Sequence, residues 1–190
     1  MRVIDRNTSC TELATIVSQT LQQAGITAVL SGGAAVSIYT ENRYQSNDLD
    51  FVTGERIVDL VAALAPLGFV RGSDRHLSHP DSEYYVEFPP GPLAIGGTIV
   101  SEWNQLETEF GTLQILSPTQ VVMDRLSAYI HWNDLPSLDQ AVMVAQNHSL
   151  EWKTLQAWCA EDGAIEQYET FRRALRKKQP PRDRYRSPDS

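Results

Sequence analysis

The sequence predicts an α/β fold of the α+β type, a mixed sheet with flanking helices followed by a C-terminal helical part. Two observations support this prediction. Short apolar runs bounded by glycine or proline alternate with helix-period segments as far as residue 116, and beyond it every patterned segment has helical spacing. We therefore expect a core over residues 1–116, a helical region over 117–178 and a disordered tail over 179–190.

The individual elements follow from local patterns. Residues 9–12 have the form of a capping box, and apolar residues then recur at helical spacing until Gly25. Strands are expected at 26–30, 48–52, 69–71, 84–88, 98–101, 106–110 and 112–116. Further helices are expected at 34–39, 57–64, 118–129, 138–147, 149–158 and 164–178. Residues 72–81 are expected to form a hairpin turn and 93–97 an exposed loop.

Composition limits the classes of protein to consider. The chain has 190 residues, of which 42% are apolar, sufficient for a buried core. It has no run of about eighteen apolar residues and no basic-then-apolar leader, so we expect no membrane partner, no secretion and a cytoplasmic location. Cys10 and Cys159 are far apart and lack Cys-x-x-Cys spacing, which indicates reduced thiols rather than a structural zinc.

Charge is distributed unevenly along the chain. Residues 172–190 hold eight basic and two acidic side chains, a net charge of +6, whereas the other 171 residues have a net charge of −14. A basic tail on an acidic body suggests an anionic partner such as nucleic acid. The same cations also suit the last turns of a helix that ends before Pro180, where they offset the helix dipole.

A glycine turn joins a predicted strand to a predicted helix. Ser31, Gly32 and Gly33 follow the apolar run 26–30 and precede the apolar segment 34–39. Two glycines leave room for a bulky group to approach the backbone, and a helix start presents unpaired N–H groups with a partial positive charge. This turn is therefore a candidate phosphate cradle.

An Asp-Leu-Asp-Phe-Val run begins fifteen residues after Gly33. The strand period of two places Asp48 and Asp50 on one face, and Leu49 and Phe51 on the other. Two neighbouring carboxylates repel each other, so each raises the pKa of the other unless a cation lies between them. Mg²⁺ supplies such a cation and brings a triphosphate with it.

A glycine pair that opens a helix, followed by Asp-x-Asp on the next strand, resembles the polymerase-beta-like nucleotidyltransferase superfamily in its small prokaryotic form. The resemblance spans about residues 26–160 and extends distantly to nucleotidyltransferase toxins of abortive-infection toxin–antitoxin pairs. The family has a third carboxylate on a later strand, usually Asp, and Glu87 in the run 84–88 is similar to it, though one methylene longer. Its toxins carry a basic residue early in the helix after residues 117–120, where Arg125 matches.

The resemblance implies transfer of a nucleoside monophosphate from an NTP to an acceptor hydroxyl on an RNA end, a protein or a small molecule. The implied cofactor is Mg²⁺, with Mn²⁺ as the alternative ion. The implied catalytic metal ligands are Asp48, Asp50 and Glu87, of which Glu87 also takes the acceptor proton. The implied nucleotide-binding residues are Ser31, Gly32, Gly33 and Arg125.

Other interpretations of the same residues stay open. A catalytically degenerate member would keep the fold and act as a binding module, for example a toxin–antitoxin component with a cognate partner. A metal-dependent hydrolase would need His76 and His79 to converge on the Asp pair. Arg125 would alternatively form an ion pair on its helix, and the proline–glycine segment 89–92 either contacts the acceptor or only connects elements.

Overall fold

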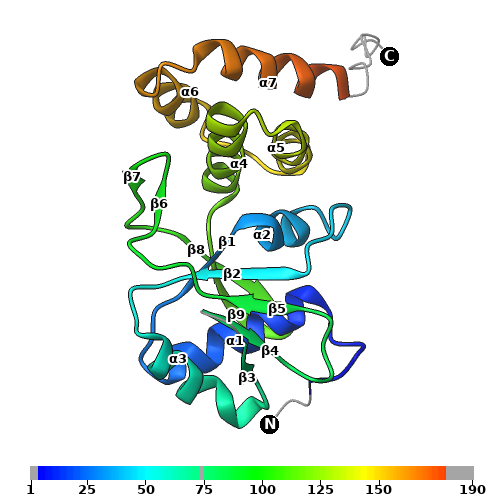
Figure 1. Cartoon of the computed structure of the whole chain (residues 1–190). Helices are drawn as coiled ribbons and strands as arrows, with labels where there is room; N and C mark the ends of the chain where they lie inside the picture. Colours follow the sequence, from blue (N-terminus) through cyan, green and yellow to red (C-terminus); the bar gives the residue numbers. More distant parts are fainter. Residues whose placement is uncertain (1–3, 73–74, 179–190) are drawn as a thin grey trace, which may run out of the picture.

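A computed structural model describes residues 4–72 and 75–178 of the chain (Figure 1). These residues form a seven-stranded mixed sheet, a separate two-stranded hairpin, and helices that flank the sheet or build the C-terminal part. The predicted fold class is confirmed. In Figure 1 the C-terminal helices stand above the sheet, and the first and third helices lie below it.

The sheet has the strand order β3-β4-β5-β2-β1-β9-β8 within the described residues. Its strands are β1 (Val29–Ser31), β2 (Asp48–Val52), β3 (Val70–Arg71), β4 (His76–Ser78), β5 (Tyr85–Glu87), β8 (Asn104–Thr108) and β9 (Gly111–Ile115). The pairs β2–β5 and β1–β9 are parallel, and the other neighbours are antiparallel. Strand β2 therefore lies between two strands, β1 and β5, that are far apart in the sequence.

Three helices pack around the sheet. They are α1 (Cys10–Gln23), α2 (Gly32–Tyr39) and α3 (Ile57–Leu64), the last continued by the short 3-10 turn η1 (Ala65–Leu67). Helix α1 begins at the predicted cap, where Ser9 Oγ accepts a hydrogen bond from the Glu12 N–H at 3.2 Å. Helix α2 packs against β2 on one side and against the C-terminal helices on the other, so it joins the two parts.

The C-terminal part consists of α4 (Pro118–Trp132), α5 (Leu135–Asn147), α6 (Trp152–Glu161) and α7 (Ile165–Lys178). Helix α4 begins with the predicted capping box, in which Ser117 and Gln120 each accept a hydrogen bond from the other's N–H. Helix α5 begins three residues earlier than predicted because Asp134 caps it, accepting from the Ser137 N–H at 3.4 Å.

Two predicted loops contain strands. Residues 76–78 form β4 rather than part of a turn, because Leu77 is fully buried between two polar neighbours and gives this segment a strand period. Residues 93–97 contribute to a hairpin of β6 (Ala94–Ile95) and β7 (Thr98–Ile99) rather than an exposed loop. Ile95 is buried and β6 packs against α4, so apolar burial decided both segments.

Several other expectations have clear outcomes. Cys10 and Cys159 are free and buried, as expected of reduced thiols. None of the helices in residues 4–72 and 75–178 combines the length and apolar character that a membrane span needs. The predicted tail at 179–190 lies outside the described residues, and the boundary at residue 116 stays a prediction.

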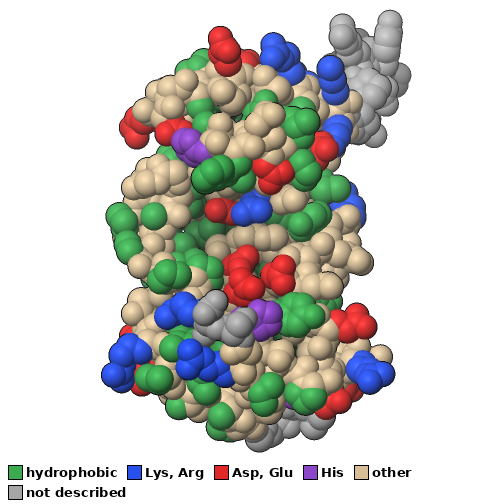
Figure 2. Space-filling view, in the orientation of Figure 1, with side chains coloured by type: hydrophobic (Ala, Val, Ile, Leu, Met, Phe, Trp, Pro, Cys, Tyr) green, Lys and Arg blue, Asp and Glu red, His purple; other side chains and the backbone are tan. Residues whose placement is uncertain are grey.

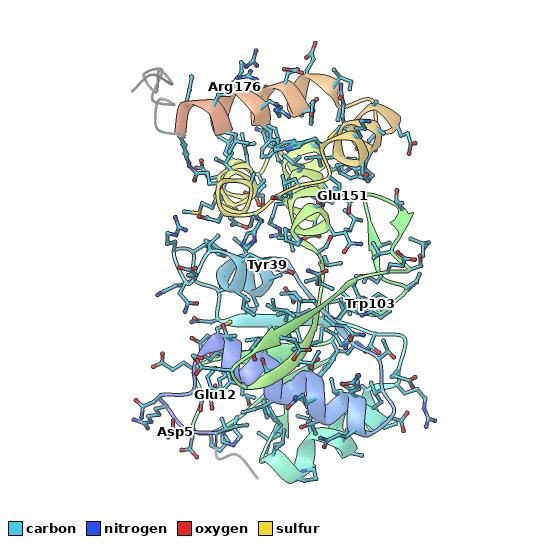
Figure 3. All side chains as sticks on the ribbon, turned by 180° about the vertical axis from the view of Figure 1, so that it is seen from behind. Asp5, Glu12, Tyr39, Trp103, Glu151 and Arg176 are labelled. Atoms are coloured by element: carbon cyan, nitrogen blue, oxygen red, sulfur yellow. The ribbon has the colours of Figure 1, made fainter. Side chains whose placement is uncertain are left out.

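Tyr39, at the end of α2, connects the sheet to the helical part (Figure 3). Its hydroxyl donates to the Leu116 carbonyl at 2.8 Å and accepts from Asn104 Nδ2 at 3.3 Å. Its backbone carbonyl lies 2.7 Å from Nε2 of His148, which follows α5. Burial raises the pKa of the Tyr39 phenol to about 12, so the hydroxyl stays a donor at all ordinary pH values.

Replacing Tyr39 by Phe leaves the Leu116 carbonyl without this donor in a buried place, and we expect a loss of about 1–2 kcal/mol in the free energy of unfolding. Urea denaturation followed by circular dichroism measures it. Tyr85→Phe is the control, since Tyr85 is 42% exposed. Equal midpoints for the two variants would contradict the connecting role of Tyr39.

Candidate functional site

Four polar residues form a row across β1, β2, β5 and β4. Ser31 is opposite Asp50, Asp50 is opposite Glu87, and Glu87 is opposite His76. Residues that are opposite each other in a sheet share a face. The parallel pairing of β2 with β5 thus places two of the predicted carboxylates side by side, and Asp48 lies on the same face two residues before Asp50.

The opposite face of these strands belongs to the core. Leu49, Phe51 and Val86 are fully buried, whereas Asp48 is exposed and Asp50 is half-buried. The apolar side chains fix the register, because a slip of one residue would move the carboxylates into the core. The predicted alternation along Asp-Leu-Asp is therefore present.

Asp50 is the electrostatic centre of this face. Burial, together with the negative charges of Glu87 and Asp48, raises the pKa of its carboxyl from an ordinary value of 3.8 to about 6, while Arg125 acts in the opposite direction. Negative charge is thus concentrated where solvent is partly excluded. A bound cation would relieve this repulsion.

The glycine turn lies directly against Asp50. Gly32 has a φ of +62°, and a Cβ at this position would overlap the Asp50 Oδ2 atom. A Cβ on Gly33 would lie 2.9 Å from Ser46 Oγ. A side chain at either glycine would therefore have to displace a neighbouring side chain, and Gly32 also has a left-handed backbone that favours glycine.

The N-terminus of α2 has no side-chain cap, which leaves its N–H groups available to an anion. Ser31 is its N-cap residue but makes no side-chain capping bond. The Ser31 hydroxyl instead donates to the Asp50 backbone carbonyl at 3.3 Å. The first N–H groups of the helix consequently lack the side-chain acceptor that usually satisfies them, although phosphate binding by Ser31, Gly32 and Gly33 stays a prediction.

A cavity of about 240 Å³ separates the sheet from α4. Its polar lining comes from the glycine turn, β2 and α4, and its apolar lining mainly from the segment after β5. The lining residues are Ser31, Gly32, Asp50, Val52, Pro89, Leu93, Ala94, Ile95, Leu116, Asp124 and Arg125. Figure 2 shows acidic side chains grouped at mid-height on this face, below a hollow with a basic side chain on its far side.

Arg125 shares this cavity with Asp50 but also has a partner on its own helix. Its guanidinium forms an ion pair with Asp124 at 2.5 Å, so the ion-pair alternative is observed. The same side chain lines the cavity. A phosphate contact by Arg125 stays a prediction, and it would have to compete with Asp124.

His76 was not predicted as part of the site. Its Nδ1 lies 3.4 Å from Glu87 Oε1, and its ring lies 4.8 Å from the ring of Tyr85. His79 packs edge-on against Phe69 instead, and its Nδ1 accepts a hydrogen bond from a backbone N–H. The two histidines therefore do not converge on the Asp pair. The strand period around Leu77 was the signal that could have placed His76 beside Glu87.

The fit of a metal ion depends on the donor set. Among residues 4–72 and 75–178, no group of three or more His, Cys, Asp or Glu side chains is arranged to hold an ion. The oxygens of Asp48, Asp50 and Glu87 are nevertheless the kind that Mg²⁺ prefers, and Mg²⁺ often takes one or two carboxylates together with substrate phosphates. The residues fit an ion that arrives with a polyphosphate, and the three-ligand set stays a prediction.

Fold and site together define an α/β protein with an acidic sheet face beside a glycine turn. No family model matches the chain, and no curated protein matches it. Among solved structures, the chain is similar to the antibiotic-resistance factor ANT(2'')-Ia in solution, with 16% identity and a TM-score of 0.47 over 89% of this chain and 91% of that one.

The chain is also similar to the crystal structure of ANT(2'')-Ia in complex with adenylyl-2''-tobramycin. The identity is 16% and the TM-score 0.48, over 89% of this chain and 97% of that one.

Adding a side chain at Gly32 should destabilise the protein more than adding one at a glycine that has a similar left-handed backbone but open space around it. Gly97 has a φ of +83°, and a Cβ there would meet no described atom within 4 Å. We expect Gly97→Ala to cost about 1 kcal/mol of stability and Gly32→Ala about 1–2 kcal/mol more, because of the overlap with Asp50. Thermal unfolding of both variants measures the difference, and equal losses would refute the overlap.

Ionised Asp50 should destabilise the fold. Its pKa is about 6 in the folded chain against an ordinary 3.8, so the penalty is absent below about pH 4 and complete above about pH 6. We expect Asp50→Asn to raise the free energy of unfolding at pH 7.5 by about 1–2 kcal/mol after allowance for solvent screening. The gain should disappear at pH 3.5. Chemical denaturation at both pH values tests this, with Glu161→Gln as the control, because Glu161 is exposed and lies on α6, away from this acidic face.

Proposed function

We propose that the chain is a Mg²⁺-dependent nucleotidyltransferase that moves a nucleoside monophosphate from an NTP to an acceptor hydroxyl. The observation that carries this proposal is the register of the sheet, which sets Asp50 opposite Glu87 and beside the glycine turn at Gly32. An acidic face for a cation thus adjoins a helix start for phosphates.

The residues of the chain have separate roles in this proposal. Asp48, Asp50 and Glu87 hold Mg²⁺, which supplies positive charge for the phosphates and the leaving pyrophosphate. The N–H groups at the start of α2 bind phosphate oxygens next to Gly32 and Gly33. Glu87 has a side chain that is 46% exposed, so an acceptor hydroxyl can reach it and transfer its proton there.

The acceptor would enter on the side of the segment after β5. Pro89, Leu93, Ala94 and Ile95 line the cavity that contains Asp50, which supports an acceptor contact for this segment rather than a purely connecting role.

Some of the basic residues near the C-terminus have partners within the chain. Arg172 lies 4.3 Å from the Trp152 ring centroid, and Lys178 pairs with Asp139 at 2.7 Å. Arg176, Lys177 and Lys178 lie in the last turn of α7, which supports the helix-end explanation for these three cations.

A second candidate is a catalytically degenerate binding module, such as a toxin–antitoxin component. Two observations favour it. The described residues contain no preformed group of three metal ligands, and the guanidinium of Arg125 is paired with Asp124. Such a module would keep the fold and the acidic face without binding Mg²⁺ and a triphosphate together.

Titration calorimetry with each of the four NTPs and Mg²⁺ separates the two candidates. The transferase predicts Mg²⁺-dependent binding that weakens at least about tenfold in an Asp48→Ala, Asp50→Ala double variant, because each charged contact is worth about 1.5–3 kcal/mol. A Glu161→Ala, Glu166→Ala double variant removes two exposed acidic groups elsewhere and should bind normally. Thermal melts establish that all proteins are folded. If folded wild type binds no NTP, the transferase proposal is wrong.

A further inference from the structure

A charged cluster on the C-terminal helices faces the acidic strand residues across the cavity. It consists of Asp124 and Arg125 on α4 and Gln140 on α5. Asp124 and Arg125 line the cavity together with Asp50. Neither Asp124 nor Gln140 has a role in the proposed transfer. Both are bonded to Arg125, the one cationic side chain among the described residues that line this cavity.

The guanidinium of Arg125 is held by both neighbours. Its Nε and Nη2 donate to Asp124 Oδ2 at 3.0 and 2.5 Å, and its Nη1 donates to Gln140 Oε1 at 3.4 Å. Successive residues of a helix do not face each other, so the contact between Asp124 and Arg125 requires both side chains to turn together. Gln140 is only 7% exposed, which gives the guanidinium a fixed support.

The bond to Asp124 uses the donors that a phosphate would need. An Arg side chain binds phosphate through neighbouring N–H groups of its planar fork, as it binds carboxylate. Here Nε and one terminal nitrogen point at a single carboxylate oxygen. The side chains of Arg125 and Asp124 are 19% and 24% exposed, so water screens their attraction only partly.

We propose that Asp124 is an internal competitor for the phosphate-binding donors of Arg125 and thereby sets the affinity of the cavity for polyphosphate anions. Gln140 is the positioning residue that keeps the guanidinium at the cavity wall while the partner changes from carboxylate to phosphate. This inference rests on the proposed function, since it takes the triphosphate of an NTP as the competing anion.

Removal of the Asp124 carboxylate has two effects that must be separated. It releases the donors of Arg125, and it removes one negative charge near Asp50 that would repel any anion. Only the first effect requires Arg125. A double-mutant cycle between positions 124 and 125 therefore isolates the competition from the general change in charge.

The test uses the full chain and inorganic tripolyphosphate with excess Mg²⁺, at fixed ionic strength and pH 7.5, by titration calorimetry. We expect Asp124→Asn to tighten binding about tenfold and Arg125→Ala to weaken it about tenfold. In the Arg125→Ala background, Asp124→Asn should give only the smaller gain, about twofold, that follows from the loss of a repelling charge. Asp139→Asn is the matched control, because Asp139 also pairs with a cation but lies outside the cavity. It should leave the affinity unchanged.

Each result decides between the alternatives. Unchanged or weaker binding by Asp124→Asn overturns the competition, as does an equal gain in the Arg125→Ala background. If one of these two results is found but wild type binds NTPs with Mg²⁺, the proposed function stands without the competition by Asp124. If neither wild type nor any variant binds a triphosphate, the proposed function and the competition are both wrong. A purely structural ion pair would lower the melting temperature of Asp124→Asn without tightening binding, and Asp124→Ser serves if the Asn variant does not fold.

Discussion

The site depends on the packing of one half-buried carboxylate against a residue without a side chain. Asp50 lies against Gly32, and a Cβ at that position would overlap its Oδ2 atom. Burial and two neighbouring carboxylates raise the pKa of Asp50 to about 6, so the fold holds negative charge where it is costly. Such an arrangement is stable only because the strand register leaves no alternative, and it makes the face receptive to a cation.

The register in turn depends on the core beneath the site. Leu49, Phe51 and Val86 are fully buried on the far side of the same strands, and their burial contributes about 1.5–3 kcal/mol each. Sliding β2 by one residue would exchange these side chains with the carboxylates. The hydrophobic effect therefore positions the charges, and the parallel pairing with β5 brings Glu87 to Asp50.

The helical part completes the site from the other side. Tyr39 connects α2 to Leu116 and to His148, next to α5, so α4 and α5 are held above the sheet. Arg125 is thereby placed over a cavity that also contains Asp50. Arg125 is bonded to Asp124, which suggests that anion binding is adjusted by a local contact as well as by the sheet.

The sequence by itself determined the features that depend on neighbouring residues. Periodicity placed β2 and α3 at their observed bounds, the Ser117 capping box fixed the start of α4, and the alternation of Asp48 and Leu49 assigned the two faces of β2. Only the tertiary structure decided which distant segments meet. The pairing of Asp50 with Glu87 and the contact of Arg125 with Gln140 depend on strand pairing and helix packing. No local pattern encodes these two contacts, because burial of the whole core decides which distant segments meet.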